Sequence, residues 1–246
     1  MLKPLSLYEV LESRRQIDWF YMSMNPNAVH LLENNPDKIN WCYLSANPNA
    51  IQFLKKNPEC IDWAWLSRNP NAIHLLQENH ERIHWDWLSM NPNAIQLLEQ
   101  NPEKINWHCL SLNPNAVHML EQNSERIDWY WLPMNSNAIH LLVKNLDKIN
   151  LSLLSMNPNA IDFLEQNSDK IDWGQLSRNP NAIHLLEQNL DKIDWFYLSM
   201  NPNAIHLLET NLNKIHFKMV SRNSSLFEEK IYTEELIMKS NSHQTS

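Results

Sequence analysis

The stretch Asn35–Lys56, NPDKINWCYLSANPNAIQFLKK, is followed at once by Asn57–Glu78, NPECIDWAWLSRNPNAIHLLQE. The two 22-residue segments carry the same Asn-Pro pairs, the same Ile-x-Trp motif and the same Leu-Ser pair at the same offsets. Self-similarity at a fixed short period is the sequence signature of a repeat protein. This repeat therefore decides the fold.

The period of 22 residues holds along almost the whole chain. Ile recurs at this spacing from Ile17 to Ile215, and a large apolar residue, usually Trp, stands two positions after each Ile. Asn recurs in two further series, one beginning at Asn25 and one at Asn35. We call residues at the same position in successive copies a column and name each column by its first member. Each column has about nine to ten members, so the chain contains about nine to ten copies of the repeat.

Each copy predicts two short helices. Asn is a strong N-cap and Pro is favoured at the first helical position, so we expect one helix to begin at Asn35 and a second at Asn47. Because Asn tolerates the left-handed conformation, the Asn35 column is also expected to close the preceding helix. Helices this short are marginal alone. Stacking must stabilise them, and we expect Trp, Ile and Leu to form the core.

The expected fold is all-α, a right-handed α-solenoid of about nine to ten two-helix, 22-residue repeats with degenerate caps. With helices packed about 9 Å apart, roughly ten layers would give a rod on the order of 90 Å long. The predicted organisation is an N-terminal cap at 1–16, the solenoid at 17–220, a C-terminal cap at 221–239 and a disordered tail at 240–246.

Composition excludes several function classes. The net charge of −8 and the pI near 5.7 disfavour nucleic-acid binding, which normally rests on a basic patch. Cys42, Cys60 and Cys109 have neither metal-ligand nor disulfide spacing, which fits a reducing intracellular setting. No apolar run approaches the ~18 residues of a membrane span. We therefore expect an intracellular protein with no membrane partner.

Catalysis and metal binding find little support in the sequence. The single glycine, Gly174, leaves no phosphate-binding glycine loop. Serine recurs in almost every copy from Ser23 as a structural column, whereas a catalytic constellation should occur once. The His30 column is interleaved with Gln and Asp, so its imidazoles are expected on a solvated face rather than around a metal. We expect no enzyme, no cofactor and no metal.

One motif resembles a known kind of repeat. Asn-Pro-Asn-Ala-Ile-His-Leu-Leu-Glu followed by Ile-Asp-Trp-x-x-Leu-Ser, as in Asn179–Ser199, resembles short tandem repeats of proteins encoded by giant DNA viruses that infect amoebae. The resemblance covers residues 17–220 and implies a viral setting, in the host cytoplasm or the virus particle, without an established activity. In layout the unit is also similar to the leucine-rich variant repeat, a right-handed solenoid of short helices.

Recognition should use columns that vary between copies and face outward. On a helical wheel with Ile39 at 0°, Cys42 and Ala46 share a face near 300–340°. Met is frequent in the second of these columns and suits an adaptable binding surface, although the same stripe is typical of packing between layers. The candidate partner-binding residues on this face are Phe20, Met24, Arg68, Asp86, Met90, His108, Tyr130, Met134, Met156, Arg178, Phe196 and Met200.

Two further features carry predictions. The neighbouring Tyr21 column, rich in Tyr and Trp, is expected to be half-buried, with aromatic tips available to a ligand. Irregular residues gather between Trp129 and Leu153, including Pro133 late in the first helix, where it removes a helical hydrogen bond. We predict a bend or a local apolar patch there; neutral drift with compensation is the alternative.

The leading functional hypothesis is a non-enzymatic protein–protein interaction scaffold, with self-association through the apolar variable face as one mode. An alternative is a modular nucleic-acid-binding helical repeat in which each layer meets one base. Arg68, Arg178 and Arg222 are too sparse to form the basic track that such a reader needs. A third alternative is a structural component of a virus particle.

Overall fold

The computed structural model describes residues 18–227, and within that range it contains α-helices and 3₁₀ turns without a strand. Each copy folds as one layer, in which a first short helix is followed by an Asn-led turn and a second short helix. We number the layers from one, which contains Asn25, to ten, which contains Asn223. The first helices are α2 (Trp19–Met22), α4 (Trp41–Ser45), α6 (Trp63–Ser67), α8 (Trp85–Ser89), α10 (Trp107–Leu110), α13 (Leu151–Leu154), α15 (Trp173–Leu176), α17 (Trp195–Leu198) and α19 (Phe217–Val220), with the 3₁₀ turn η9 (Leu132–Met134) in layer six.

The second helices begin directly after the alanine of the Asn-Pro-Asn-Ala motif. They are α3 (Val29–Glu33), α5 (Ile51–Lys56), α7 (Ile73–Glu78), α9 (Ile95–Glu99), α11 (Val117–Gln122), α12 (Ile139–Leu142), α14 (Ile161–Gln166), α16 (Ile183–Glu187) and α18 (Ile205–Glu209). Layer ten is described only as far as its turn η15 (Ser224–Phe227). The expectation of an all-α repeat solenoid is confirmed.

The predicted start of the first helix is wrong. Asn35 leads only a 3₁₀ turn, η2 (Pro36–Lys38), and makes no capping bond; its side chain instead donates to the carbonyl of Leu31, near the end of α3. The chain is extended at Ile39 and Asn40, and Asn40 caps α4 by accepting from the Tyr43 amide at 3.0 Å. Asn35 has φ −136°, so it closes the preceding helix without a left-handed residue. Ile39 therefore lies outside the helix, and its angle on the helical wheel has no meaning.

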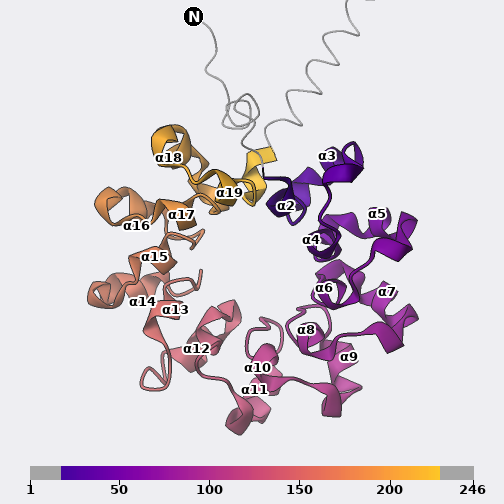
Figure 1. Cartoon of the computed structure of the whole chain (residues 1–246). Coiled ribbons are helices and arrows are strands. Elements are labelled where there is room, and N and C mark those ends of the chain that lie inside the picture. Colours follow the sequence, from indigo (N-terminus) through magenta and orange to yellow (C-terminus); the bar gives the residue numbers. More distant parts are fainter. Residues whose placement is uncertain (1–17, 228–246) are drawn as a thin grey trace, which may run out of the picture.

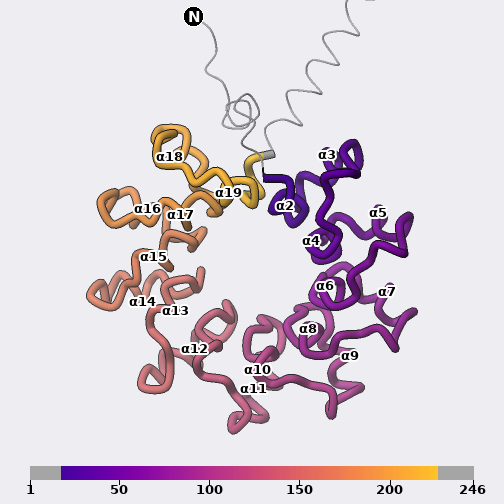
Figure 2. Tube along the Cα trace, in the orientation of Figure 1, coloured from indigo at the N-terminus to yellow at the C-terminus, as the bar shows by residue number. Residues whose placement is uncertain are grey.

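The predicted rod is also wrong, because the layers close into a ring. Figure 1 shows the first helices on the inside and the second helices on the outside, with α2 lying next to α19. The tube in Figure 2 follows the same closed path from indigo to yellow. Neighbouring first helices contact one another, as α4 contacts α6 and α6 contacts α8. The layers lie closer together on the inside than on the outside. Since ten layers complete the ring, each layer is rotated by one tenth of a circle relative to the preceding one.

A ladder of buried asparagines joins the layers. Asn47 is fully buried, and its side-chain amide donates to the carbonyls of Ser23 at 3.1 Å and Asn25 at 2.9 Å in the preceding layer. Its side-chain oxygen accepts from its own turn, at the Asn49 amide. The Ser23 hydroxyl accepts from the Asn40 amide at 3.0 Å. Since an unpaired buried polar group costs about 1–3 kcal/mol, these bonds fix how each layer sits on the next.

The same ladder closes the ring between layers ten and one. Asn25 donates to the carbonyls of Ser221 at 3.4 Å and Asn223 at 2.8 Å, and the Asp18 amide donates to the Ser221 hydroxyl at 3.0 Å. Asn27 donates to the carbonyl of Ser224 at 3.0 Å. Every one of these offsets equals the internal offset if the chain is counted as a circle of ten 22-residue copies. The seam is thus built like an internal junction.

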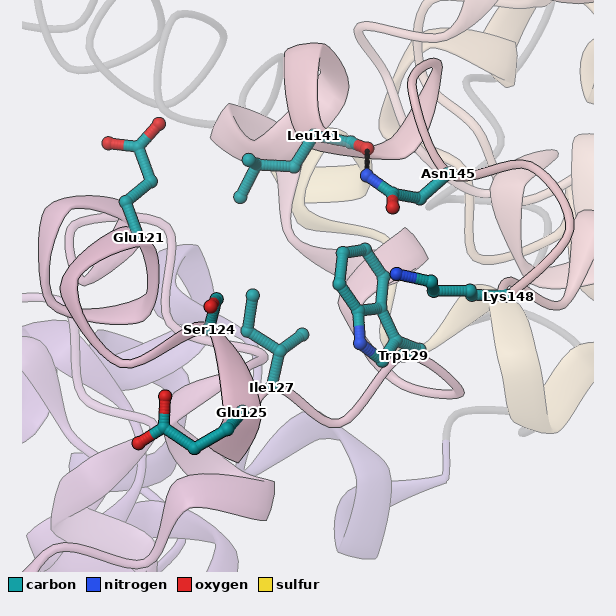
Figure 3. Close-up of a pocket in the computed structure, with 8 residues that line it drawn as sticks. All are labelled: Glu121, Ser124, Glu125, Ile127, Trp129, Leu141, Asn145 and Lys148. Carbon is teal, nitrogen blue, oxygen red and sulfur yellow. Dashed lines mark hydrogen bonds between the residues drawn. The ribbon is translucent and has the colours of Figure 1, made fainter.

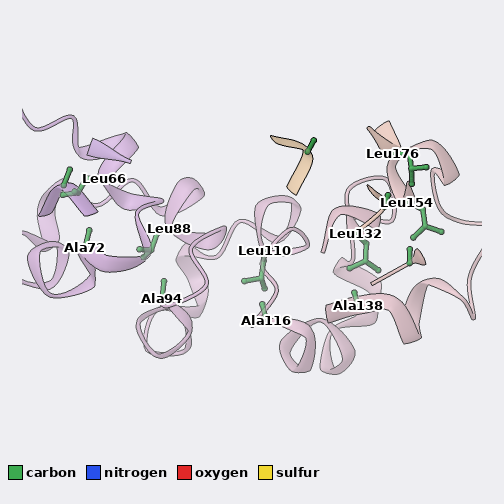
Figure 4. Close-up of a cluster of buried hydrophobic side chains, with 14 of the residues drawn as sticks. Leu66, Ala72, Leu88, Ala94, Leu110, Ala116, Leu132, Ala138, Leu154 and Leu176 are labelled. Atoms are coloured by element: carbon green, nitrogen blue, oxygen red, sulfur yellow. The ribbon is translucent and has the colours of Figure 1, made fainter. Parts of the chain in front are cut away.

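The core consists of leucine and alanine, not tryptophan. The columns of Met22, Ala28 and Leu32 are buried through the described layers. Figure 4 shows members of the first two columns side by side in successive layers, such as Leu66 with Ala72 and Leu110 with Ala116. The prediction of a buried Trp column is wrong, because each tryptophan of the Trp19 column is only partly buried. Cations of the next layer cover several of these rings: Lys38 lies 4.4 Å from the centroid of Trp19, and Lys214 lies 4.6 Å from that of Trp195.

Layer six changes locally without bending the stack. Its first helix is replaced by η9, as expected for a proline that removes a helical hydrogen bond. The layer nevertheless keeps its place, because Asn157 donates to the carbonyls of Pro133 at 2.9 Å and Asn135 at 3.0 Å, as in regular layers. The predicted bend is therefore wrong. Tyr130, 54% exposed, and Val143, 41% exposed, are the large apolar side chains that this region leaves on the surface.

The predicted boundaries are only partly covered by the structure. The N-terminal cap at 1–16 and the tail at 240–246 lie outside the described residues. Of the C-terminal cap at 221–239, residues 221–227 are described, and they form the ring seam rather than a free end. None of the helices in residues 18–227 has the length and apolarity needed to cross a membrane.

Candidate binding surface inside the ring

The Met24 column lies on the inner wall of the ring, at the C-terminal ends of the first helices. Nine of its ten members directly follow the buried serine at the end of a first helix, and Met134 follows Pro133 in layer six. The first helices form the inner wall (Figure 1). Nine of these side chains are half-buried and that of Arg68 is exposed. The ladder and the leucine core make no use of them. The column consists of Met24, Ala46, Arg68, Met90, Leu112, Met134, Met156, Arg178, Met200 and Arg222.

Three arginines of this column approach one another from different layers. Arg68 belongs to layer three, Arg178 to layer eight and Arg222 to layer ten. Although the side chain of Arg68 is exposed, nearby protein atoms partly desolvate its guanidinium, and this desolvation, followed by the positive charge of Arg222, lowers the pKa of Arg68. Burial also lowers the pKa of Arg178, with Tyr197 acting in the opposite direction and Arg222 in the same one. Guanidinium groups separated by two and three layers influence one another, so these side chains extend toward the centre of the ring.

Each of the three guanidinium groups lies over an aromatic ring of the next layer. Arg68 lies 5.7 Å from the centroid of Trp87 and Arg178 lies 5.2 Å from that of Tyr197. Arg222 lies 5.6 Å from the centroid of Tyr21, so this contact also crosses the seam. Such contacts hold the charge in place and leave the N–H edges of the guanidinium available.

The Tyr21 column is half-buried, as predicted. Its aromatic members contact one another from layer to layer, with ring centroids 5.0 Å apart for Tyr43 and Trp65 and 4.8 Å apart for Trp65 and Trp87. Most of these are edge contacts, which aromatic quadrupoles favour. From Tyr21 to Trp87 these contacts form an unbroken row, which Cys109, Leu153 and Gln175 interrupt in later layers.

The Phe20 column lies at the other end of the first helices, near their N-terminal residues. Its polar members bond to the capping residue of the next layer: Asp86 accepts from the Asn106 side chain at 2.9 Å, and His108 pairs with Asp128. Its large members stay on the surface, with Phe20 46%, Tyr130 54% and Phe196 41% exposed. This column therefore forms one edge of the inner wall.

The predicted binding residues thus form two neighbouring circles. The structure brings seven of them to the interior and places the other five at the edge. The interior residues are Met24, Arg68, Met90, Met134, Met156, Arg178 and Met200, and the edge residues are Phe20, Asp86, His108, Tyr130 and Phe196.

Sequence reasoning missed Arg222 as a member of this surface. Its copy diverges after Asn223 and was therefore predicted to be a cap. The available signal was that Ser221, Arg222 and Asn223 still keep the Ser-x-Asn spacing. In an open terminal layer Asn223 would still bond to Ser199 and Asn201 of layer nine, but the Ser221 hydroxyl would have no following layer from which to accept.

A shallow pocket lies on the outside of the ring, between layers five and six. Its volume is about 400 Å³, and its walls include Glu121, Trp129, Leu141 and Lys148 (Figure 3). Lys148 lies 4.8 Å from the Trp129 centroid, and Asn145 is bonded to the Leu141 carbonyl at 2.9 Å. Lys148 and Asn145, two polar groups of this pocket, therefore already have partners.

The His30 column is exposed on the outer helices, as predicted. Several of its members pair with a glutamate of the preceding layer, such as His140 with Glu121 at 2.8 Å and His184 with Glu165 at 2.7 Å. Exposed pairs of this kind contribute little stability. Within residues 18–227, no three His, Cys, Asp or Glu side chains are grouped so that they could hold a metal ion.

Two cysteines, Cys42 and Cys109, belong to the columns of the inner wall, and neither has a thiol activated as a nucleophile. Burial, with the neighbouring Asp62, raises the pKa of the Cys42 thiol, and burial, with Asp86, raises that of Cys109. A raised pKa disfavours the thiolate, which is the nucleophilic form.

Comparison with known proteins adds no assignment: no protein-family model, no curated protein and no solved structure matches the chain. The resemblance to giant-virus repeats therefore stays a prediction.

Proposed function

We propose that this protein is a non-enzymatic scaffold that binds a protein partner on the inner wall of its ring. One observation carries the proposal: the Met24 column holds five methionines on a surface that neither the ladder nor the core requires. Methionine adapts to irregular partners because its side chain is unbranched and polarizable. Exposed aromatic residues at the adjoining edge, Phe20, Tyr130 and Phe196, add the side-chain type that protein interfaces favour.

The resemblance of the repeat extends this proposal to a protein made in cells infected by a giant virus. A structural role in the virus particle is compatible with a rigid ring. Abundance of the protein in purified particles, measured by quantitative mass spectrometry, separates a particle component from a scaffold that stays in the host cytoplasm.

Site-specific photocrosslinking tests the proposed surface. A benzophenone amino acid is placed at Met90 or Met134 on the inner wall, or at His74 or His184 on the outer helices as matched controls. In cells that produce the labelled protein, probes at the inner positions should yield one discrete crosslinked partner protein, and probes at the outer positions should not. Replacing Met90, Met134 and Met156 by Gln should remove that product from a probe placed at Met200. Equal products from outer and inner positions, or none from the inner positions, would overturn the proposal.

A further inference from the structure

The interior carries positive charge without a negative partner among the described residues. None of Arg68, Arg178 and Arg222 forms an ion pair with a carboxylate of residues 18–227, although other arginines do, such as Arg126 with Glu125 at 3.7 Å. Desolvation and the nearby charge of Arg222 already act against the charges of Arg68 and Arg178, whose pKa values are lowered. A fold that keeps repelling, partly desolvated charges sacrifices stability, and such groups are typical of binding sites.

The three charges converge in one plane. A closed ring has no rise along its axis, so residues of one column lie at one height. Arg68 and Arg178 are five layers apart in a ring of ten, which places them on opposite sides, and Arg222 lies between them. A ligand at the centre would meet guanidinium groups from at least three directions.

The size of the interior limits what fits. Ten helices spaced about 9 Å apart around a circle place opposite helix axes roughly 29 Å apart and opposite helix surfaces roughly 15–20 Å apart. Met and Arg side chains narrow this space further. This spacing is an upper limit, so nothing wider than a single helix, about 10–12 Å across with its side chains, or one extended chain can enter the ring. A globular domain is excluded.

The chemistry of the wall selects among narrow anions. Five methionines stand in the same circle as the arginines and offer apolar contact rather than hydrogen bonds. A ligand with both carboxylates and apolar side chains uses both components. Nucleic acid would need free aromatic faces on which bases stack, but the arginines cover Tyr21, Trp87 and Tyr197. A bare polyphosphate would leave the methionines without a partner.

From this geometry we infer that the ring interior binds one acidic, amphipathic polypeptide segment of a partner, whose carboxylates pair with Arg68, Arg178 and Arg222 while its apolar side chains pack on the methionines. Arginine binds carboxylate with two parallel N–H···O bonds, which its planar fork favours. The inference rests on the proposed function and adds the chemical class of the partner and its place in the ring.

The test uses the full-length protein and synthetic fluorescent peptides. The probe is a 16-residue helical peptide of alternating Glu and Leu pairs, and its control has Gln in place of Glu. Binding is followed by fluorescence anisotropy. The Glu peptide should bind to the unmodified protein, and the affinity of an Arg68→Gln/Arg178→Gln variant for this peptide should be at least tenfold lower. Affinity should fall with added salt, because the contacts are charged.

A matched variant controls for net charge. Arg82→Gln/Arg126→Gln removes the same two charges from exposed 3₁₀ turns, where these residues also lie over tryptophans, 5.1 Å from the Trp63 centroid and 5.0 Å from the Trp107 centroid. This variant should bind the Glu peptide within twofold of the unmodified protein. Circular dichroism confirms that both variants remain folded.

Three results would overturn the inference: no binding of the Glu peptide, equal binding of the Gln peptide, or equal loss in the two double variants. Inositol hexakisphosphate and a single-stranded oligothymidine are added as further probes. If either binds through Arg68 and Arg178 while the Glu peptide does not, the interior is an anion or nucleic-acid site instead. If the Glu peptide fails but crosslinking from Met90 and Met134 still yields a discrete protein, the scaffold function stands and only the acidic partner is wrong.

Discussion

Two junctions between layers differ in how many ladder contacts they contain. The seam between layers ten and one, which no peptide bond spans, has the complete set, whereas the junction between layers six and seven, which the chain spans, lacks one. At the seam no peptide connects layers ten and one, yet Asn25 and Asp18 make both ladder contacts, to Asn223 and Ser221. After Pro133 the chain is continuous, but proline has no hydroxyl to accept from the Asn150 amide. The ring is thus held by its serine and asparagine side chains more than by the backbone that links the layers.

The ladder asparagines should show the largest effect. Asn113 donates to the carbonyls of Ser89 at 3.0 Å and Asn91 at 2.8 Å and accepts from the Asn115 amide. Asn113→Ala should therefore lower the free energy of unfolding by about 3 kcal/mol, since three buried groups lose their partner. Urea unfolding followed by circular dichroism measures this loss.

The equivalent change at the seam should act on shape. Asn25→Ala removes the same kind of contacts, but an open seam lets water reach the freed carbonyls, so its cost should be smaller than that of Asn113→Ala. Its radius of gyration in small-angle scattering should increase, whereas that of Asn113→Ala in the folded state should not. An unchanged radius for Asn25→Ala, or an equal increase in both variants, would contradict the role given to the seam.

Restoring the missing contact should give an intermediate effect. Pro133→Ser supplies a hydroxyl for the Asn150 amide and an amide for the carbonyl of Trp129. In regular layers the serine hydroxyl donates to the equivalent tryptophan carbonyl, as Ser111 does to Trp107 at 2.9 Å. We expect the free energy of unfolding to rise by about 1 kcal/mol.

Thermal and urea unfolding measure this gain. Ser111→Ala in the preceding layer is the reciprocal control and should lose a similar amount. A neutral or destabilising Pro133→Ser would mean that layer six has compensated for its proline elsewhere.

The smallest effect is expected inside the ring. Because the pKa of Arg68 is lowered by desolvation and by Arg222, its charged form is less favourable in the folded than in the unfolded chain. This cost is present at neutral pH and disappears only as the pH rises through the folded pKa. Arg68→Met, which introduces the commonest residue of its column, should raise the free energy of unfolding by less than about 1 kcal/mol.

The gain from Arg68→Met should shrink as salt is added, because ions screen the repulsion between Arg68 and Arg222, and differential scanning fluorimetry at several salt concentrations detects this change. Arg82→Met, in an exposed turn, is the control and should give no gain. A clear loss of stability in Arg68→Met would show that its contact with Trp87 outweighs the repulsion.

Periodicity predicted the layers but not their closure. The spacing from Ile17 to Ile215 was sufficient to identify two helices per layer, and Asn47 caps its turn as expected. Curvature depends instead on small differences between the inner and outer spacing of layers, which no single residue type encodes. The capping role of Asn40 was hidden because its column alternates among Asn, Asp and His.

The candidate surface was predicted in its composition and not in its place. The wheel placed Met24 and Phe20 on one face, whereas in the structure their columns lie at opposite ends of the first helices, and the reference residue Ile39 lies outside the helix. It could not reveal that the column turns inward, since inside and outside acquire meaning only when the ring closes. The convergence of Arg68, Arg178 and Arg222 follows from closure alone.

Closure is tested most directly by distances between spin labels. After replacement of the native cysteines, one protein is labelled at Phe20 and Phe196, which are two layers apart across the seam, and a second at Asp86 and Tyr130, which are two layers apart within the chain. All four side chains are exposed. Double electron–electron resonance should give the same short distance, roughly 20 Å, for both pairs. A seam pair that is much longer or broader than the internal pair would show an open solenoid and contradict the ring.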